Sequence, residues 1–232
     1  NKSLIFIIAM KTSFLKFLTL VVIVSFTSCG EKAKEADTKD AKATVKAEAT
    51  ATIYKANQEN SMIEWKGFKP TGSHNGIISI SEGMVTVTNG KLESGNFTID
   101  MNSISVTDIP AEDEGNAKLA GHLKNADFFD VEAYPNAKFE VTGVNTSDGK
   151  TMLSGNLTIK DVTNNITFSV RTEMKDGIMT LTSETFTIDR SKWNIKYGSK
   201  SFFDNLGDRF INDDIDLTAI YLLRIKYEPQ IK

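Results

Sequence analysis

Two histidines are the side chains in this sequence best suited to acid–base or metal chemistry. His74 precedes an Asn-Gly pair, and His122 is followed closely by Asp127 and Asp130. A histidine beside a carboxylate can form a charged pair or hold a metal ion. No His-x-x-x-His pair, Gly-x-Ser-x-Gly motif or carboxylate cluster accompanies them, and 2 His with 1 Cys fall short of the four ligands usual at structural zinc. We therefore expect His74 and His122 to make structural hydrogen bonds, and we predict no catalytic activity, metal site or cofactor.

Arg190 and Lys192 are the basic residues best placed to meet an anionic ligand. They stand at the end of a predicted strand, where they could bind a pyrophosphate group. A structural ion pair between Arg190 and a carboxylate such as Asp189 or Asp208 is the alternative that we favour. Across the chain, 27 Lys and Arg are scattered among 30 Asp and Glu, for a formal net charge of -3. Such a chain has no basic face to neutralise phosphates, which argues against nucleic acid as a partner.

Residues 1–28 have the pattern of a signal peptide with some upstream residues. From Met10, two lysines precede an apolar run at 17–26, and small residues lead into Cys29. The run is about ten residues long, whereas a helix needs roughly 20 to cross a bilayer. The Phe-Thr-Ser-Cys sequence resembles the lipobox of bacterial lipoproteins, with Phe in place of the usual Leu. We predict that Cys29 is acylated and anchors the protein to a membrane of the bacterial envelope, at the periplasmic face of the outer membrane.

The segment 29–52 has the composition of a flexible tether. It contains no aromatic residue, it alternates Lys, Ala, Glu and Thr, and Val45 is its only branched apolar residue. Such a segment does not supply enough apolar surface for a core. Its apolar residues also do not recur at helical spacing, so we predict a solvated tether that ends at Thr52.

Residues 53–232 have the pattern of an all-β domain. Apolar and polar residues alternate with a period of two, for example at 97–101 and 166–171, as in half-buried strands. Asn89-Gly90, Asp148-Gly149 and Asp176-Gly177 each separate two such runs and predict tight hairpins. One short helix is expected at 116–125. Roughly eight strands could form a sandwich or a barrel, and closure is favoured because long exposed strand edges invite aggregation.

Several motifs of this domain resemble the YceI-like family of bacterial secreted proteins. The most specific is Leu119 to Pro135, LAGHLKNADFFDVEAYP; Ser61 to Gly67, SMIEWKG, and Phe186 to Trp193, FTIDRSKW, also match. One departure is Asp161, which stands where the family has glycine. The resemblance covers nearly all of residues 53–232, and it implies an extended, eight-stranded, antiparallel, lipocalin-like barrel that binds a polyisoprenoid. Some relatives pair through their barrels, which leaves a homodimer open here.

The resemblance further implies that aromatic side chains line a narrow apolar tunnel for a long-chain polyisoprenoid, such as a quinone or a prenyl carrier. Burial of apolar surface is worth about 0.8 kcal/mol per CH₂, so a long tail could bind without a strong polar anchor. Ordinary core packing is the alternative for any single aromatic residue, and a structural or partner-binding envelope lipoprotein is the alternative for the whole protein. The predicted ligand-binding residues are Trp65, Phe68, Phe97, Ile99, Phe128, Phe129, Phe139, Phe186, Trp193, Phe202 and Phe203.

Overall fold

The computed structural model describes residues 32–227, and of these residues 33–227 belong to one compact unit. The predicted signal peptide at 1–28 and the predicted acylation of Cys29 lie outside the described residues. Within the described residues, no helix has the length and apolar character needed to span a membrane.

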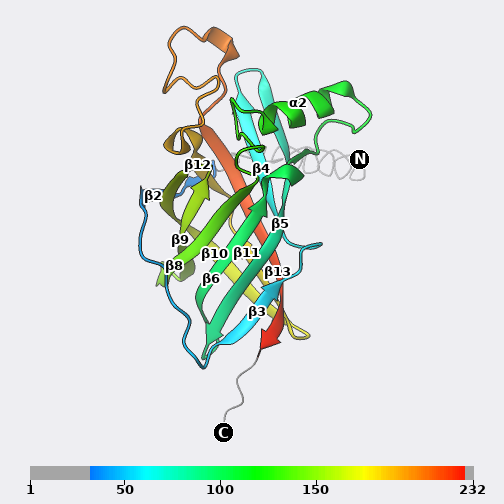
Figure 1. Cartoon of the computed structure of the whole chain (residues 1–232). Helices are drawn as coiled ribbons and strands as arrows, with labels where there is room; N and C mark the ends of the chain where they lie inside the picture. The colour runs from blue at the N-terminus through cyan, green and yellow to red at the C-terminus, as the bar shows by residue number, and fades with distance from the viewer. Residues whose placement is uncertain (1–31, 228–232) are drawn as a thin grey trace, which may run out of the picture. The chain divides into compact units, whose positions relative to one another are not determined.

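Most of the described chain is β-strand, with one α-helix and three short 3-10 helices (Figure 1). The strands are β1 (Lys34–Glu35), β2 (Asp37–Asp40), β3 (Thr52–Ala56), β4 (Met62–Lys69), β5 (Gly72–Thr88), β6 (Lys91–Asp100), β7 (Ser105–Val106), β8 (Asn136–Ser147), β9 (Lys150–Ile159), β10 (Val162–Lys175), β11 (Ile178–Ser183), β12 (Phe186–Asp189) and β13 (Asp214–Tyr227). The helices are η1 (Met101–Ser103), α2 (Glu114–Lys124), η2 (Arg190–Trp193) and η3 (Gly207–Arg209).

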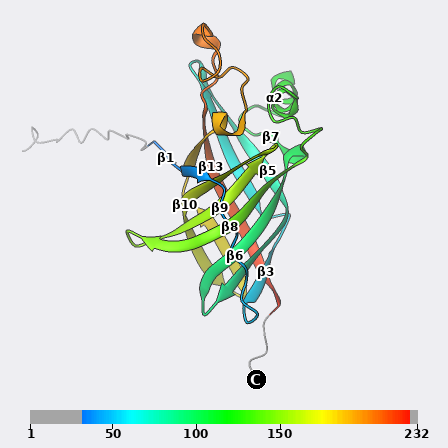
Figure 2. The ribbon, with the colours of Figure 1, turned by 60° about the vertical axis from the view of Figure 1, so that its left-hand side comes forward.

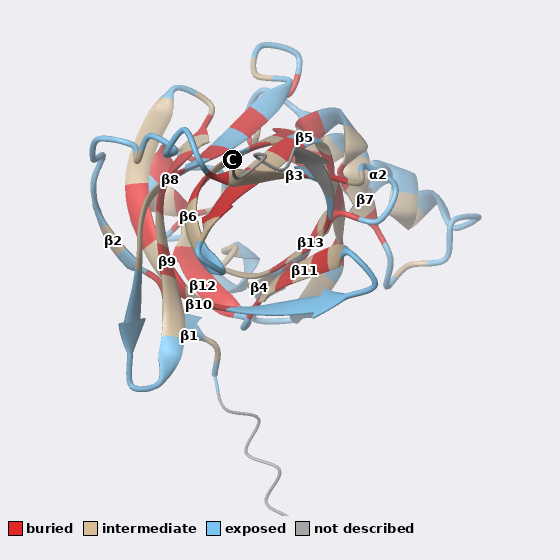
Figure 3. Ribbon diagram, turned by 90° about the horizontal axis from the view of Figure 1, so that it is seen from below, coloured by how far each residue is buried: buried red, intermediate tan, exposed pale blue. Residues whose placement is uncertain are grey.

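The strands close into an antiparallel barrel, as the sequence predicted. The ring runs β3-β5-β6-β8-β9-β10-β11-β13, and it closes because β13 pairs with both β11 and β3 (Figures 1 and 2). Seen from below, buried and exposed positions alternate along the strands around the ring (Figure 3). The inward residues therefore form the core, in agreement with the period-two pattern.

Three two-residue turns set the register of neighbouring strands. Thr88 pairs with Lys91, Ser147 with Lys150, and Lys175 with Ile178. The turn residues between them all have positive φ, from 51° to 52° at the Asn or Asp and from 73° to 75° at the Gly. These angles are those of type I′ turns, so the hairpin prediction is confirmed.

The predicted helix at 116–125 is also present, as α2. It begins two residues earlier than predicted because the Asp113 side chain accepts a hydrogen bond from Gly115 N at 2.7 Å and caps the first turn. Asn125 is its C-terminal cap, as expected.

Strands β5 and β13 change partners along their length. β5 pairs with β4 over Gly72–Ser79 and with β3 over Met84–Val87. β13 likewise pairs with β4 and β12 in its first half and with β3 and β11 in its second half. The barrel therefore has one set of strands at the end near α2, which we call the upper end as in Figure 1, and another set at the opposite end.

The segment predicted as a solvated tether differs from the structure. β1 pairs in parallel with β12, and β2 pairs with Asn164–Thr167 of β10, so residues 34–40 fill the gap between β12 and β10 at the upper end. The Asn156 amide also donates to Lys42 O at 2.6 Å and accepts from Lys42 N at 3.0 Å. The tether prediction is wrong over this range because main-chain hydrogen bonds to open strand edges hold the segment, and these bonds need no apolar side chains.

Five aromatic rings fill the middle of the barrel, and we call them the aromatic layer. Phe97 stacks on Tyr221 with ring centroids 4.0 Å apart, and Phe168 stacks on Phe186 at 4.2 Å. The ring centroids of Phe139 and Phe168 lie 5.6 Å apart. All five side chains are buried. These buried rings therefore occupy the barrel interior at this level.

Candidate functional site

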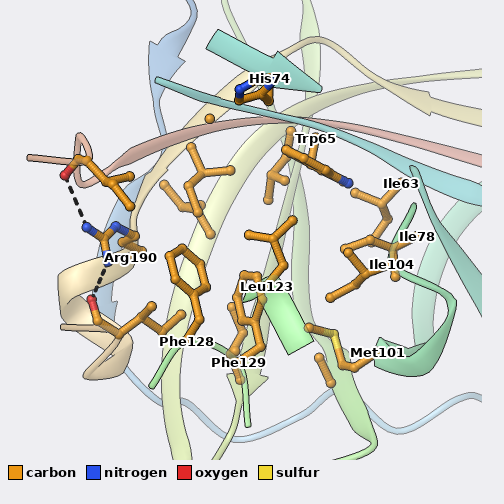
Figure 4. A pocket seen from close by; sticks show the side chains of 18 of the residues that line it. Ile63, Trp65, His74, Ile78, Met101, Ile104, Leu123, Phe128, Phe129 and Arg190 are labelled. Carbon is orange, nitrogen blue, oxygen red and sulfur yellow. Dashed lines mark hydrogen bonds between the residues drawn. The ribbon is translucent and has the colours of Figure 1, made fainter. Parts of the chain in front are cut away.

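An apolar cavity of about 230 Å³ occupies the upper end of the barrel (Figure 4). It begins next to the aromatic layer. On β6, Ile99 stands two positions beyond Phe97, and on β8, Ala137 stands two positions before Phe139. Ile99 and Ala137 line the cavity, whereas the two phenylalanines do not. The period-two alternation thus brings smaller side chains to the next inward position, and their smaller volume leaves space above the rings.

Aliphatic side chains from several strands form most of the wall. β4 contributes Ile63 and β5 contributes Ile78, while β13 contributes Ile215 and Leu217. Further apolar lining comes from β9, β12 and the connections that follow β6 and η2, namely Met101, Ile104, Leu157, Ile159, Ile188, Ile195 and Ile211.

Helix α2 and the turn after it cover one side of the cavity. Leu119 and Leu123 stand four residues apart and share the inner face of the helix. The following turn is held by hydrogen bonds from Phe129 N to Leu123 O and from Asp130 N to Asn125 O, and Asp130 has a positive φ of 50°. Phe128 and Phe129 consequently point to the cavity as an edge-to-face pair, with ring centroids 5.0 Å apart.

Arg190 lies in the cavity wall with none of its side chain exposed. Its guanidinium donates to the backbone oxygens of Ile195 at 2.8 Å and of Ile211 and Asn212 at 3.1 Å each, and it lies 3.2 Å from Asp213 Oδ1 (Figure 4). Burial lowers the pKa of Arg190, although Asp213 and Asp189 act in the opposite direction. The guanidinium is therefore occupied by protein acceptors.

The predicted structural role of Arg190 agrees with this geometry, but its ion-pair partner is Asp213 and not Asp189 or Asp208. Asp213 is the partner because it directly precedes β13 and lies beside η2, where its backbone oxygen accepts a hydrogen bond from Arg190 N at 2.8 Å. Lys192 pairs with Glu35 of β1 at 3.3 Å and does not line the cavity. Neither residue offers a free cationic group to a pyrophosphate inside the cavity.

Both histidines line the cavity, each beside a carboxylate. His74 Nδ1 lies 2.9 Å from Asp108 Oδ2, and His122 Nε2 lies 3.8 Å from Asp127 Oδ1. Across the part of the chain that the structure describes, no three His, Cys, Asp or Glu side chains gather as they would around a metal ion. The two pairs are therefore consistent with local structural roles on β5 and α2.

The residues predicted to contact ligand fall into three groups. Those that line the cavity are Trp65, Phe68, Ile99, Phe128 and Phe129. Those buried in the core outside the cavity are Phe97, Phe139 and Phe186 of the aromatic layer, together with Trp193, whose Nε1 donates to Leu157 O at 3.0 Å. Phe202 and Phe203 are 40% and 48% exposed in the segment between η2 and η3.

These differences have a common cause. Periodicity identifies which residues point inward, but it does not say at which height along the barrel the core is filled. The sequence also favours large aromatic residues as ligand contacts, whereas the lining is mostly Ile and Leu. The alternation at Ile63 and Trp65 could have identified Ile63, but no sequence signal marks Met101 or Ile104, which follow the end of β6.

Sequence comparison gives one family match. The YceI-like domain model matches residues 54–220. A UPF0312 protein of Pseudomonas putida is 31% identical over 125 residues, which cover 52% of this chain and 62% of that relative. A UPF0312 protein of Photorhabdus laumondii is 37% identical over 75 residues, which cover 30% of this chain and 39% of that relative. The chain thus spans less than two thirds of the length of these curated relatives.

Two solved structures share the fold. BcnA of Burkholderia cenocepacia superposes with a TM-score of 0.57 at 21% identity, over 72% of this chain and 98% of that chain. A polyisoprenoid binding domain of Saccharophagus degradans, implicated in plant cell wall breakdown, gives a TM-score of 0.52 at 12% identity, over 75% of this chain and 99% of that chain. At these identities the likeness is one of fold.

Proposed function

Because this chain belongs to the YceI-like domain family, we propose that it binds a long-chain polyisoprenoid or a similar amphiphilic lipid, such as a quinone or a prenyl carrier. The observation that carries the proposal is the apolar cavity above the aromatic layer, which the protein's own side chains leave unfilled. The binding activity stated for the Saccharophagus degradans domain of similar fold is in line with it.

The size of the cavity limits how much of a lipid it holds. Its volume of about 230 Å³ is below the roughly 300–1,000 Å³ of ordinary small-molecule pockets. The buried aromatic layer lies at its inner end. We propose that one end of the lipid occupies the cavity and that the rest leaves through the mouth, where partly exposed Phe68, His74, Leu119 and Ile211 stand.

Burial of even one end of a lipid is enough to offset much of the cost of association. Each buried CH₂ contributes about 0.8 kcal/mol, so about ten of them contribute roughly 8 kcal/mol. This favourable free energy is similar in magnitude to the unfavourable free energy of association, about 4–15 kcal/mol, that comes from lost rotational and translational freedom. Binding therefore also depends on contacts made by the part of the lipid outside the cavity.

We also propose that the protein is a lipoprotein held at the bacterial envelope through acylated Cys29, facing the periplasm at the outer membrane. The lipobox-like sequence before Cys29 supports this proposal. Only residues 30–33 separate Cys29 from β1, and an extended chain spans at most about 3.6 Å per residue. The link from the proposed anchor to the first strand is therefore far shorter than the tether predicted from composition.

The binding proposal is tested by extracting the protein after purification from a bacterial membrane fraction and identifying released lipids by mass spectrometry. We expect a long-chain isoprenoid from the wild type and a strongly reduced yield from Leu119→Trp, which adds volume to the cavity lining. Phe203→Trp is the matched control, because it adds an indole at an exposed site outside the cavity. Circular dichroism checks that both variants fold.

The alternative is a structural or partner-binding envelope lipoprotein without bound lipid. It predicts that no lipid is extracted from the wild type and that a purified prenyl alcohol does not change the tryptophan fluorescence, to which cavity-lining Trp65 contributes together with Trp193. Those two results together would refute lipid binding.

A further inference from the structure

The indole nitrogen of Trp65 is a buried hydrogen-bond donor without an acceptor. Trp65 is 8% exposed, it lines the cavity, and its Nε1 has no hydrogen-bond partner in the protein. In Figure 4 this nitrogen faces Ile63, which lines the cavity together with Ile78 and Ile104. The contrast is with Trp193, whose Nε1 is satisfied by Leu157 O at 3.0 Å.

A buried indole N–H without an acceptor in the protein is energetically unfavourable. Indole can only donate, and most buried polar groups in proteins have a partner. The ring lies across the neighbouring strand at Gly76, where a Cβ would lie only 2.8 Å from Trp65 Cζ2. The glycine thus leaves room for the indole in this orientation, and a phenylalanine would fill much of the same space without an unsatisfied N–H.

The other polar groups that line the cavity indicate whether the oxygen that accepts from Trp65 is charged or neutral. The Arg190 guanidinium is occupied by three backbone oxygens and Asp213, and His74 Nδ1 lies 2.9 Å from Asp108 Oδ2. His122 Nε2 is also buried without a hydrogen bond, but it lies 3.8 Å from the Asp127 carboxylate. Lys69, which also lines the cavity, is exposed at the end of β4, four residues beyond Trp65. Trp65 Nε1 faces aliphatic side chains (Figure 4), so a full negative charge placed beside it would be desolvated without an adjacent cation.

We propose that Trp65 Nε1–H donates a hydrogen bond to an uncharged oxygen of the bound lipid, either a carbonyl or a hydroxyl. This inference rests on the lipid-binding function proposed above, and it specifies the class of ligand. The oxygen-bearing end of the lipid lies inside the cavity beside Ile63, and the apolar chain extends from there towards the mouth. A pyrophosphate lipid does not bind in this position.

The test compares probes that share one chain but differ at its end: a C20 prenyl alcohol, the C20 hydrocarbon without the hydroxyl, and the C20 prenyl pyrophosphate. Each is offered in phosphatidylcholine vesicles, and its partition to wild type and to Trp65→Phe is measured with radiolabel. We expect the wild type to prefer the alcohol over the hydrocarbon by about fivefold, the ratio that one net hydrogen bond supplies. Trp65→Phe should lose this preference while it binds the hydrocarbon as the wild type does.

The outcomes separate this inference from the proposed function. If the wild type takes up none of the probes, lipid binding itself fails. If it takes them up but Trp65→Phe keeps the preference for the alcohol, or loses affinity for the alcohol and the hydrocarbon equally, the hydrogen bond is refuted and lipid binding stands. Tighter binding of the pyrophosphate than of the alcohol would also overturn the assignment of an uncharged oxygen.

Discussion

Replacing Arg190 with methionine removes a buried side chain that ties the segment after η2 to the barrel. The guanidinium donates to the backbone oxygens of Ile195, Ile211 and Asn212 and pairs with Asp213. It also lies over the Phe128 ring, 5.3 Å from its centroid. Methionine retains part of the aliphatic volume, so the substitution mainly removes polar contacts.

The expected loss of stability follows from these contacts. Removal of one partner from a buried ion pair costs about 3–5 kcal/mol, because the remaining polar groups stay buried without a partner. Asp213 keeps hydrogen bonds from the hydroxyls of Ser199 at 2.8 Å and Ser201 at 2.7 Å. We therefore expect the lower end of that range, about 3 kcal/mol. For a domain of this size, that loss corresponds to a decrease in Tm of roughly 6–12 °C.

Urea unfolding followed by far-UV circular dichroism measures this loss as a decrease in the free energy of unfolding at unchanged m-value. Lys192→Met is the matched control, because the Lys192–Glu35 pair at 3.3 Å is solvent-exposed and such pairs contribute about 1 kcal/mol or less. If Arg190→Met were no more destabilising than Lys192→Met, the guanidinium would not hold this segment, and our account of the cavity wall would be wrong.

Two further predictions concern packing and pH. A Cβ on Gly155 would lie 2.2 Å from Phe139 Cζ, so Gly155→Ala should lower the free energy of unfolding, measured in urea, by about 1–3 kcal/mol. The variant should still bind a prenyl alcohol in the cavity, because Phe139 does not line it. Burial acts to raise the pKa of Asp108, but hydrogen bonds from the Asn75 N–H and the His74 ring lower it by more, to a net value below the ordinary 3.8. A carboxyl with a lowered folded-state pKa contributes stability above its unfolded pKa and loses it as the pH falls through the folded value. Unfolding free energies measured from pH 6 down to pH 2 should therefore decrease less steeply for Asp108→Asn below about pH 4 than for the wild type; parallel curves would contradict this assignment.

The local elements of the fold were predictable from the sequence because local interactions determine them. Asn89-Gly90 and Asp148-Gly149 adopt the positive φ angles that a two-residue hairpin needs, and few other residue pairs do so at low cost. The Asp113 cap was not identified, which explains the two-residue error at the start of α2. Closure into a barrel was favoured from edge protection, and the pairing of β13 with β3 confirms it.

The features of the site depended on contacts between distant parts of the chain. Residues 34–40 were predicted to be solvated because their side chains are polar, but the free edges of β12 and β10 hold their backbone. Phe139 and Ala137 are both inward on β8 and have the same sequence signature, yet one belongs to the aromatic layer and the other lines the cavity.

By itself, the sequence determined the strands, the hairpins, the inward faces and the family resemblance, because these depend on backbone preferences and on a period of two along one strand. Only the tertiary structure decided where the barrel is filled, which charged groups are already occupied, and that Trp65 Nε1 has no acceptor. The physical reason is that packing volume and hydrogen-bond satisfaction are sums over side chains from many strands, and no single segment contains that information.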